Sequence, residues 1–186
     1  MYFRVIAAVV LMASTSAALA DEISDAIDQA RKSYQSGDLG NAKQSLDLAS
    51  QLVAQKNAER FAALMPAPLS GWKAEEAQTA AGGGYGFGGS TASRTYTSAK
   101  DEQVNLKITG DSTLITQYAA IIANPMIAGM AGKVVLIGKE RAIQDKNGDI
   151  NMIVLNKYLI TVDGSGPAAA KLSYAQAIDL AKLAKL

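Results

Sequence analysis

Near its start, the chain repeats apolar side chains with the spacing of an α-helix. Within residues 22–64 they recur three or four positions apart, first over 23–34 and again over 39–53. Ser36-Gly37-Asp38 interrupts the pattern, and Asp38 is suited to cap the second helix. Pro66 then stops the helix, because proline removes a backbone donor. The pattern predicts an αα-hairpin over residues 21–65.

This hairpin resembles one tetratricopeptide-type repeat. The matching positions lie in the run ARKSYQSGDLGNAKQSLDLA and are Ala30, Tyr34, Gly37, Leu39, Ala42, Leu46 and Ala49. Alanines would let the two helices approach, and the larger residues would fill the space between them. A repeat array needs at least three repeats, because each repeat buries its face on a neighbour. We therefore expect a single hairpin that docks on another element.

After a Pro-rich connector at 66–71, the spacing of apolar residues changes from helical to alternating. Val104, Leu106 and Ile108 alternate with polar neighbours, as in a strand with one buried face. The same pattern predicts strands near 92–96, 141–145, 150–154 and 158–162, and the unbroken apolar run 134–137 predicts a central strand. Asn147-Gly148 is typical of a type I′ hairpin turn. Such short links indicate a mostly antiparallel sheet.

Two stretches predict helices that cover this sheet. One spans 112–123 with Ser112 as its N-cap, and the other spans 167–185 with Pro167 in its first turn. The segment 126–130 is too short and glycine-rich to predict a good helix. The predicted fold class is α+β: an N-terminal αα-hairpin, then a mostly antiparallel sheet covered by two helices over 72–186.

In its order of elements, the segment 70–186 resembles the Mog1/PsbP-like fold, including the DcrB type of bacterial envelope protein. PLSGW at 68–72 and VDGSG at 162–166 are similar to stretches of secreted bacterial proteins. Members of that group mostly act as binding or assembly factors and share no active site. The resemblance implies an accessory role and transfers no catalytic residue.

The beginning of the chain has the features of a secretory signal peptide. Arg4 precedes an apolar run over 5–12, and Ala18-Leu19-Ala20 fits a cleavage site. The apolar run is too short to span a bilayer. We expect a signal peptide over 1–20, a mature chain in the periplasm or outside the cell, and no stable membrane span after signal removal.

The composition narrows the possible chemistry. The chain contains no Cys and no His, which excludes a cysteine nucleophile, a Ser-His-Asp triad and a Cys/His zinc site. Removing Arg4 with the signal leaves 17 basic and 17 acidic residues, whereas a nucleic-acid-binding protein needs a basic excess. We predict no enzyme activity, no cofactor, no metal and no nucleic-acid partner. An enzymatic alternative would need one cleft to gather carboxylates such as Glu75, Glu76, Asp101 and Glu102.

A glycine-rich stretch, AAGGGYGFGGSTASRTY at 80–96, contains a G-x-G-x-x-G motif that ends at Gly89. In a dinucleotide site this motif follows a strand and opens a helix, but here the residues after it predict a strand. We interpret it as a flexible hairpin tip whose glycines need no individual geometry. Tyr85 and Phe87 would give the tip an aromatic surface for a partner.

A second motif, DKNGDIN at 145–151, resembles the start of a calcium-binding loop. An EF-hand needs Gly at the sixth position and a bidentate Glu at the twelfth, where this chain has Ile150 and Asn156. We interpret the stretch as a hairpin turn that does not bind calcium.

The segment 112–132 carries no charged residue. Its first half predicts a helix that packs on the sheet, and its second half offers Met126, Ile127 and Met130 as an adaptable apolar surface. With Tyr85 and Phe87, these are the predicted partner-binding residues. The predicted function is that of a secreted or periplasmic, non-enzymatic accessory protein that binds or supports another envelope component. The alternative is a carrier of a small apolar ligand, held in a pocket between helix 112–123 and the sheet.

Overall fold

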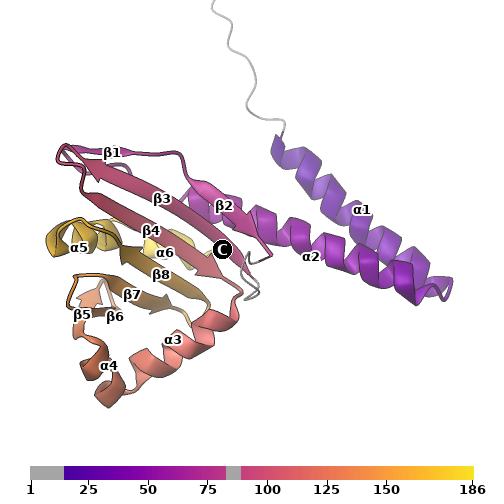
Figure 1. Cartoon of the computed structure of the whole chain (residues 1–186). Helices are drawn as coiled ribbons and strands as arrows, with labels where there is room; N and C mark the ends of the chain where they lie inside the picture. The colour runs from indigo at the N-terminus through magenta and orange to yellow at the C-terminus, as the bar shows by residue number, and fades with distance from the viewer. Residues whose placement is uncertain (1–14, 83–88) are drawn as a thin grey trace, which may run out of the picture. The chain divides into compact units, whose positions relative to one another are not determined.

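The computed structural model describes residues 15–82 and 89–186. The chain divides into two compact units, Met1–Val53 and Ala54–Leu186. The first unit is the predicted hairpin, formed by α1 (Thr15–Gln35) and the beginning of α2 (Leu39–Ala62) (Figure 1). The second unit starts inside α2 and not at the expected connector 66–71, because the end of α2 contributes side chains to the core of the sheet.

The hairpin closes on small side chains. Its buried residues are Ala26, Ala30 and Ser33 in α1 and Ala42 and Ala49 in α2. The larger residues predicted to fill the space between the helices are exposed instead: Tyr34, Leu39 and Leu46. That expectation was wrong because neighbouring residues on a helix point about 100° apart, so Tyr34, directly after the buried Ser33, points away from the interface.

The turn between the two helices follows the sequence prediction. Gly37 has a φ of 80°, a conformation that glycine adopts without strain. The Asp38 carboxylate accepts the backbone N–H of Asn41 at 3.0 Å, which satisfies a donor at the start of α2. The hydrogen bonds from Asn41 lower the pKa of Asp38. The predicted cap is confirmed.

The second unit is built on one antiparallel sheet. Its strands, in chain order, are β1 (Trp72–Ala74), β2 (Gln78–Ala81), β3 (Ser90–Ser98), β4 (Gln103–Gly110), β5 (Lys133–Ile137), β6 (Glu140–Gln144), β7 (Ile150–Val154) and β8 (Tyr158–Asp163). Their order in space is β1-β3-β4-β8-β7-β6-β5, and β2 also pairs with β3. The last strand in the chain therefore lies in the middle of the sheet, between β4 and β7. The predicted α+β class is confirmed.

One face of the sheet carries the main core. Leu106, Ile108, Met152 and Ile160 are fully buried there, as their alternation with polar residues predicts. This face packs against the end of α2 and against α5 (Ala168–Gln176) and α6 (Leu180–Leu183).

The opposite face is covered only in part. Helix α3 (Thr113–Ala123) packs on it, and Ile115 contacts Ile153 and Leu159. The Ser112 hydroxyl accepts the backbone N–H of Leu114 at 3.3 Å, so the predicted N-cap is confirmed. Beyond α3, the same face bears polar side chains.

The C-terminal helix predicted over 167–185 is wrong as a single element. It divides into α5 and α6, because Asp179 starts a new helix by accepting the backbone N–H of Lys182 at 2.9 Å. Aspartate favours such a cap over the interior of a helix, since its short side chain competes for nearby backbone groups. Pro167 occupies the N-cap of α5.

The turn between β6 and β7 also differs from the prediction. A type I′ turn needs two consecutive residues with positive φ, but of the pair Asn147-Gly148 only Gly148, at 81°, has one. The Asp145 carboxylate accepts the backbone N–H groups of Asn147 and Asp149 at 2.8 and 2.9 Å and stabilises a longer turn. Positive φ occurs at two consecutive positions after β7 instead, at Leu155 and Asn156.

A buried lysine joins α5 to this turn. The Lys171 ammonium donates to the carbonyl oxygen of Asn147 at 2.9 Å and to the Asp149 carboxylate at 2.5 Å. Lys171 is 1% exposed, and a buried ammonium without a counter-charge is costly. The turn therefore supplies the charge that this lysine needs.

We expect Asp149→Asn to lower the free energy of unfolding more than Lys171→Met does. Asp149→Asn leaves the buried ammonium without a counter-charge, which costs about 3 to 5 kcal/mol. Lys171→Met removes the buried charge and leaves a carboxylate whose side chain is 27% exposed, at a cost of about 1 to 3 kcal/mol. Urea denaturation of the two variants measures the difference.

The matched control is the pair Lys43 and Asp47, which has the same 2.5 Å separation but two exposed side chains. Neutralising either of these residues should change the free energy of unfolding by less than about 0.5 kcal/mol. If Lys171→Met lowers the free energy of unfolding more than Asp149→Asn does, the expectation is contradicted, because the unpaired buried ammonium would then not be the main cost.

Two tyrosines stack in the main core. The ring centroids of Tyr96 and Tyr174 are 4.1 Å apart. The Tyr96 hydroxyl donates to the carbonyl oxygen of Pro66 at 2.8 Å, and the Tyr174 hydroxyl accepts the backbone N–H of Leu69 at 3.1 Å. These bonds attach the segment after α2 to β3 through Tyr96 and to α5 through Tyr174. Burial raises the pKa of both tyrosines. The pKa of Tyr96 rises to about 12, although the positive charge of Arg94 acts to lower it.

The free energy of unfolding should therefore fall as the pH rises from 10 to 12. In the unfolded chain Tyr96 loses its proton near pH 10, while in the folded chain it keeps the proton to about pH 12. Its contribution is present below pH 10 and is lost as the pH rises toward 12, by roughly 1 to 3 kcal/mol. Urea unfolding across this range should show a shallower loss for Tyr96→Phe than for the unmodified protein. Tyr34→Phe, at an exposed position, should leave the slope unchanged.

Candidate functional site

The predicted partner-binding residues fall into two groups. Tyr85 and Phe87 lie outside the described residues. Met126, Ile127 and Met130 lie on α4 (Pro125–Ala131), so the expectation that 126–130 is not a helix was wrong. The Asn124 side chain accepts the backbone N–H groups of Met126 and Ile127 at 3.0 and 3.4 Å. This cap compensates for the shortness of the helix.

The side chains of α4 are divided between the sheet and the surface. Ala128 is 2% exposed, and α4 contacts β5 and β6. Met126 and Met130 are 78% and 85% exposed, and Ile127 is also exposed. The small Ala128 seats the helix on the sheet, while both methionines point away from it.

Strand β5, beside α4, is at the edge of the sheet and not in its centre. The run 134–137 predicts a central strand because it is apolar on both faces. The structure corrects this: β5 pairs with β6 on one side and ends the strand order on the other. Val135 and Ile137 pack with the main core, whereas Val134 and Leu136 are 47% and 66% exposed.

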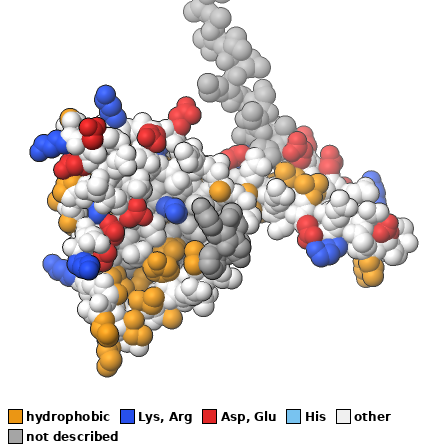
Figure 2. All heavy atoms as spheres, viewed as in Figure 1, with side chains coloured by type: hydrophobic (Ala, Val, Ile, Leu, Met, Phe, Trp, Pro, Cys, Tyr) orange, Lys and Arg blue, Asp and Glu red, His pale blue; other side chains and the backbone are white. Residues whose placement is uncertain are grey.

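Together these residues form one apolar area, which we call the α4–β5 surface: Met126, Ile127, Met130, Val134 and Leu136. Figure 2 shows hydrophobic side chains gathered over the part of the molecule where α3 and α4 lie. The sequence predicted the helical members of this surface. It missed Val134 and Leu136, although alternate large apolar residues in a strand are a signal for an open edge as well as for a core.

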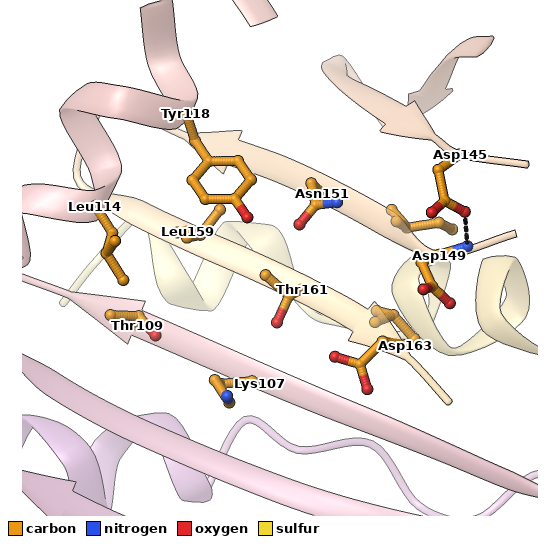
Figure 3. A pocket seen from close by; sticks show the side chains of 12 residues that line it. Lys107, Thr109, Leu114, Tyr118, Asp145, Asp149, Asn151, Leu159, Thr161 and Asp163 are labelled. Carbon is orange, nitrogen blue, oxygen red and sulfur yellow. Dashed lines mark hydrogen bonds between the residues drawn. The ribbon is translucent and has the colours of Figure 1, made fainter. Parts of the chain in front are cut away.

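A groove lies beside α3 on the partly covered face of the sheet (Figure 3). Its volume is about 350 Å³. Leu114 and Tyr118 of α3 form one wall, and polar side chains of β4, β7 and β8 form most of the floor, including Lys107, Asn151 and Thr161. The turn before β7 closes the far end with Asp145 and Asp149. The space directly under α3 is filled by Ile115, Ile153 and Leu159.

The ionisable groups with displaced pKa values have structural causes. The pKa of Asp179 is lowered mainly by a hydrogen bond from the backbone N–H of Lys182, and the pKa of Asp38 is lowered in the same way by Asn41. The two tyrosines with raised pKa values, Tyr96 and Tyr174, lie in the main core and belong neither to the α4–β5 surface nor to the groove. Of the carboxylates proposed for an enzymatic cleft, Asp101 and Glu102 lie in the turn between β3 and β4, where Glu102 accepts the Ser98 hydroxyl at 3.0 Å. None of these four carboxylates lines the groove beside α3.

The carboxylates of the calcium-like motif already form contacts within the protein. The Asp145 carboxylate holds two backbone N–H groups, and the Asp149 carboxylate pairs with Lys171. Within residues 15–82 and 89–186, no three Cys, His, Asp or Glu side chains gather in a way that could hold a metal ion. No helix in the same ranges is long and apolar enough to cross a membrane.

The glycine-rich stretch connects β2 to β3. These strands pair antiparallel, and the N–H of Gly82 donates to the carbonyl oxygen of Gly89 at 3.0 Å. No helix follows the motif, as predicted. The view that its glycines need no individual geometry is wrong at Gly89, where φ is 98° and a Cβ would lie 2.3 Å from the carbonyl oxygen of Gly110.

Comparisons of the chain with models of known protein families, with curated proteins and with solved structures find no match. The resemblance of residues 70–186 to Mog1/PsbP-like proteins thus stays a prediction.

Proposed function

We propose that this protein is a non-enzymatic accessory protein of the bacterial cell envelope that binds an extended segment of another envelope protein on the α4–β5 surface. The observation that carries the proposal is the open edge of β5. This edge is flanked by the exposed side chains of Val134 and Leu136 and by the exposed methionines of α4.

An open strand edge can bind another chain by strand addition. The backbone N–H and C=O groups on the free side of β5 offer hydrogen bonds to an extended segment, and alternate side chains supply specificity. Val134 and Leu136 lie on the same face of β5, because side chains alternate along a strand. A partner segment with apolar residues at alternate positions would cover both of them, and the flexible methionines of α4 could adjust to it.

The opposite edge of the sheet provides a contrast. It is formed by two short strands, β1 and β2, and its exposed positions include Lys73, Glu75, Glu76 and Gln78. Charged residues and interruptions discourage pairing with other chains. This difference favours β5 as the edge that receives a partner.

The other parts of the proposal have separate support. The absence of Cys and His removes the usual nucleophile and base, and the displaced pKa values have structural causes, which favours a binding role over catalysis. The signal-like beginning of the chain supports export to the envelope. The aromatic pair at Tyr85 and Phe87 stays a predicted second contact.

Site-specific photocrosslinking tests the proposed edge. A crosslinking amino acid at Leu136 of the full chain, expressed in its own cells, should give a defined adduct with an envelope protein, because Leu136 faces the expected partner. The same amino acid at Lys73, on the opposite edge, is the matched control and should give no such adduct. Adducts of equal yield at both positions would contradict binding at β5.

A variant then measures the energetic contribution of the edge. Val134→Lys should weaken binding of the purified partner by about tenfold or more, as expected for a central interface residue. Because Val134 is about half exposed and its side chain points away from the main core, the free energy of unfolding should change by less than about 0.5 kcal/mol. Unchanged affinity in a folded Val134→Lys variant would place the binding site elsewhere.

A further inference from the structure

We propose that the groove beside α3 binds an uncharged, polyhydroxylated ligand of the size of one or two sugar rings. This inference does not depend on the proposed function of the α4–β5 surface, which involves other residues. It rests on a row of polar side chains that stand together on three neighbouring strands.

The register of the sheet creates this row. Thr161 of β8 pairs with Lys107 of β4 on one side and with Asn151 of β7 on the other. Paired residues in an antiparallel sheet point to the same face. The three side chains therefore lie side by side in the floor of the groove, and Tyr118 stands over them from α3 (Figure 3).

These four side chains have unused hydrogen-bonding groups. Within the described residues, no side chain or backbone group forms a hydrogen bond with Lys107 Nζ, Thr161 Oγ1, the Asn151 amide or the Tyr118 hydroxyl. The next row along the same face is different, because Thr95 donates to Asn105 and Asn105 donates to Asp163, both at 3.1 Å. In the groove, by contrast, four such groups without a partner lie close together.

The chemistry of these groups matches a sugar. The ammonium, phenol and amide donate, while the amide oxygen and the hydroxyls accept, so adjacent ligand hydroxyls could find both kinds of partner. The Tyr118 ring offers an apolar surface for the C–H face of a sugar ring. A volume of about 350 Å³ lies at the small end of the range for ligand sites.

Other ligand classes fit the groove less well. An apolar ligand would cover the unpaired polar groups without satisfying them, which argues against the apolar carrier considered from the sequence. A cation would meet Lys107, and the carboxylates nearby are already engaged: Asp149 with Lys171, Asp145 with its own turn and Asp163 with Asn105. An anion would face those three aspartates. A neutral ligand avoids both conflicts.

Ligand-observed saturation-transfer NMR on the full chain tests this inference. The probes are glucose, maltose, N-acetylglucosamine and N,N′-diacetylchitobiose, each at up to about 20 mM, a range that detects weak binding. At least one probe should bind. Tyr118→Ala should weaken binding about tenfold through loss of the ring, and Thr161→Val should weaken it about three- to tenfold through loss of one hydrogen bond.

Thr97→Val is the matched control. Thr97 lies on the same face of the sheet, on β3, and does not line the groove, so its loss should leave the affinity unchanged. If Tyr118→Ala does not fold, Tyr118→Phe and Thr161→Val carry the test, since both keep the shape of the side chain. The inference is overturned if no probe binds, or if binding is equal in the groove variants and the control.

Discussion

The pairing of β8 with β4 is the constraint on which the second unit depends. Strands β1 to β4 form one antiparallel group, and β5 to β8 form another that follows the chain from the edge of the sheet inward. The two groups are joined where β4 pairs with β8, and the pairs Leu106↔Val162 and Ile108↔Ile160 are fully buried. A shift of one residue would turn these side chains to the opposite face. Burial of this small set thus holds the register of the whole sheet.

Unequal coverage of the two faces of the sheet follows from this pairing. The core face gathers α5, α6 and the end of α2 around Tyr96 and Tyr174. The other face receives α3, which is long enough to bury Leu159 and Ile153 but leaves the next row of residues open. The groove is the part of this polar face that α3 does not cover, and α3 forms one of its walls.

The same order of strands explains the open edge. Because β8 takes the central position, the strand farthest from it in the second group, β5, is left with a single neighbour. The chain arrives at β5 through α4, so this helix lies against the edge with its methionines exposed. The two candidate surfaces are therefore products of one topology, and they present different chemistry: one is an apolar edge and the other a polar groove.

The sequence by itself determined most of the strands and the inward face of the central ones. The alternation of Val104, Leu106 and Ile108 predicted the buried face of β4, and Ser112 and Asp38 marked the helix starts that they cap. The tertiary structure alone decided the order of the strands, because apolar periodicity does not distinguish an edge from a centre: 134–137 has the pattern of a central strand and occupies an edge. It also decided the burial of Lys171, whose counter-charge comes from a turn that only the folded sheet brings to α5.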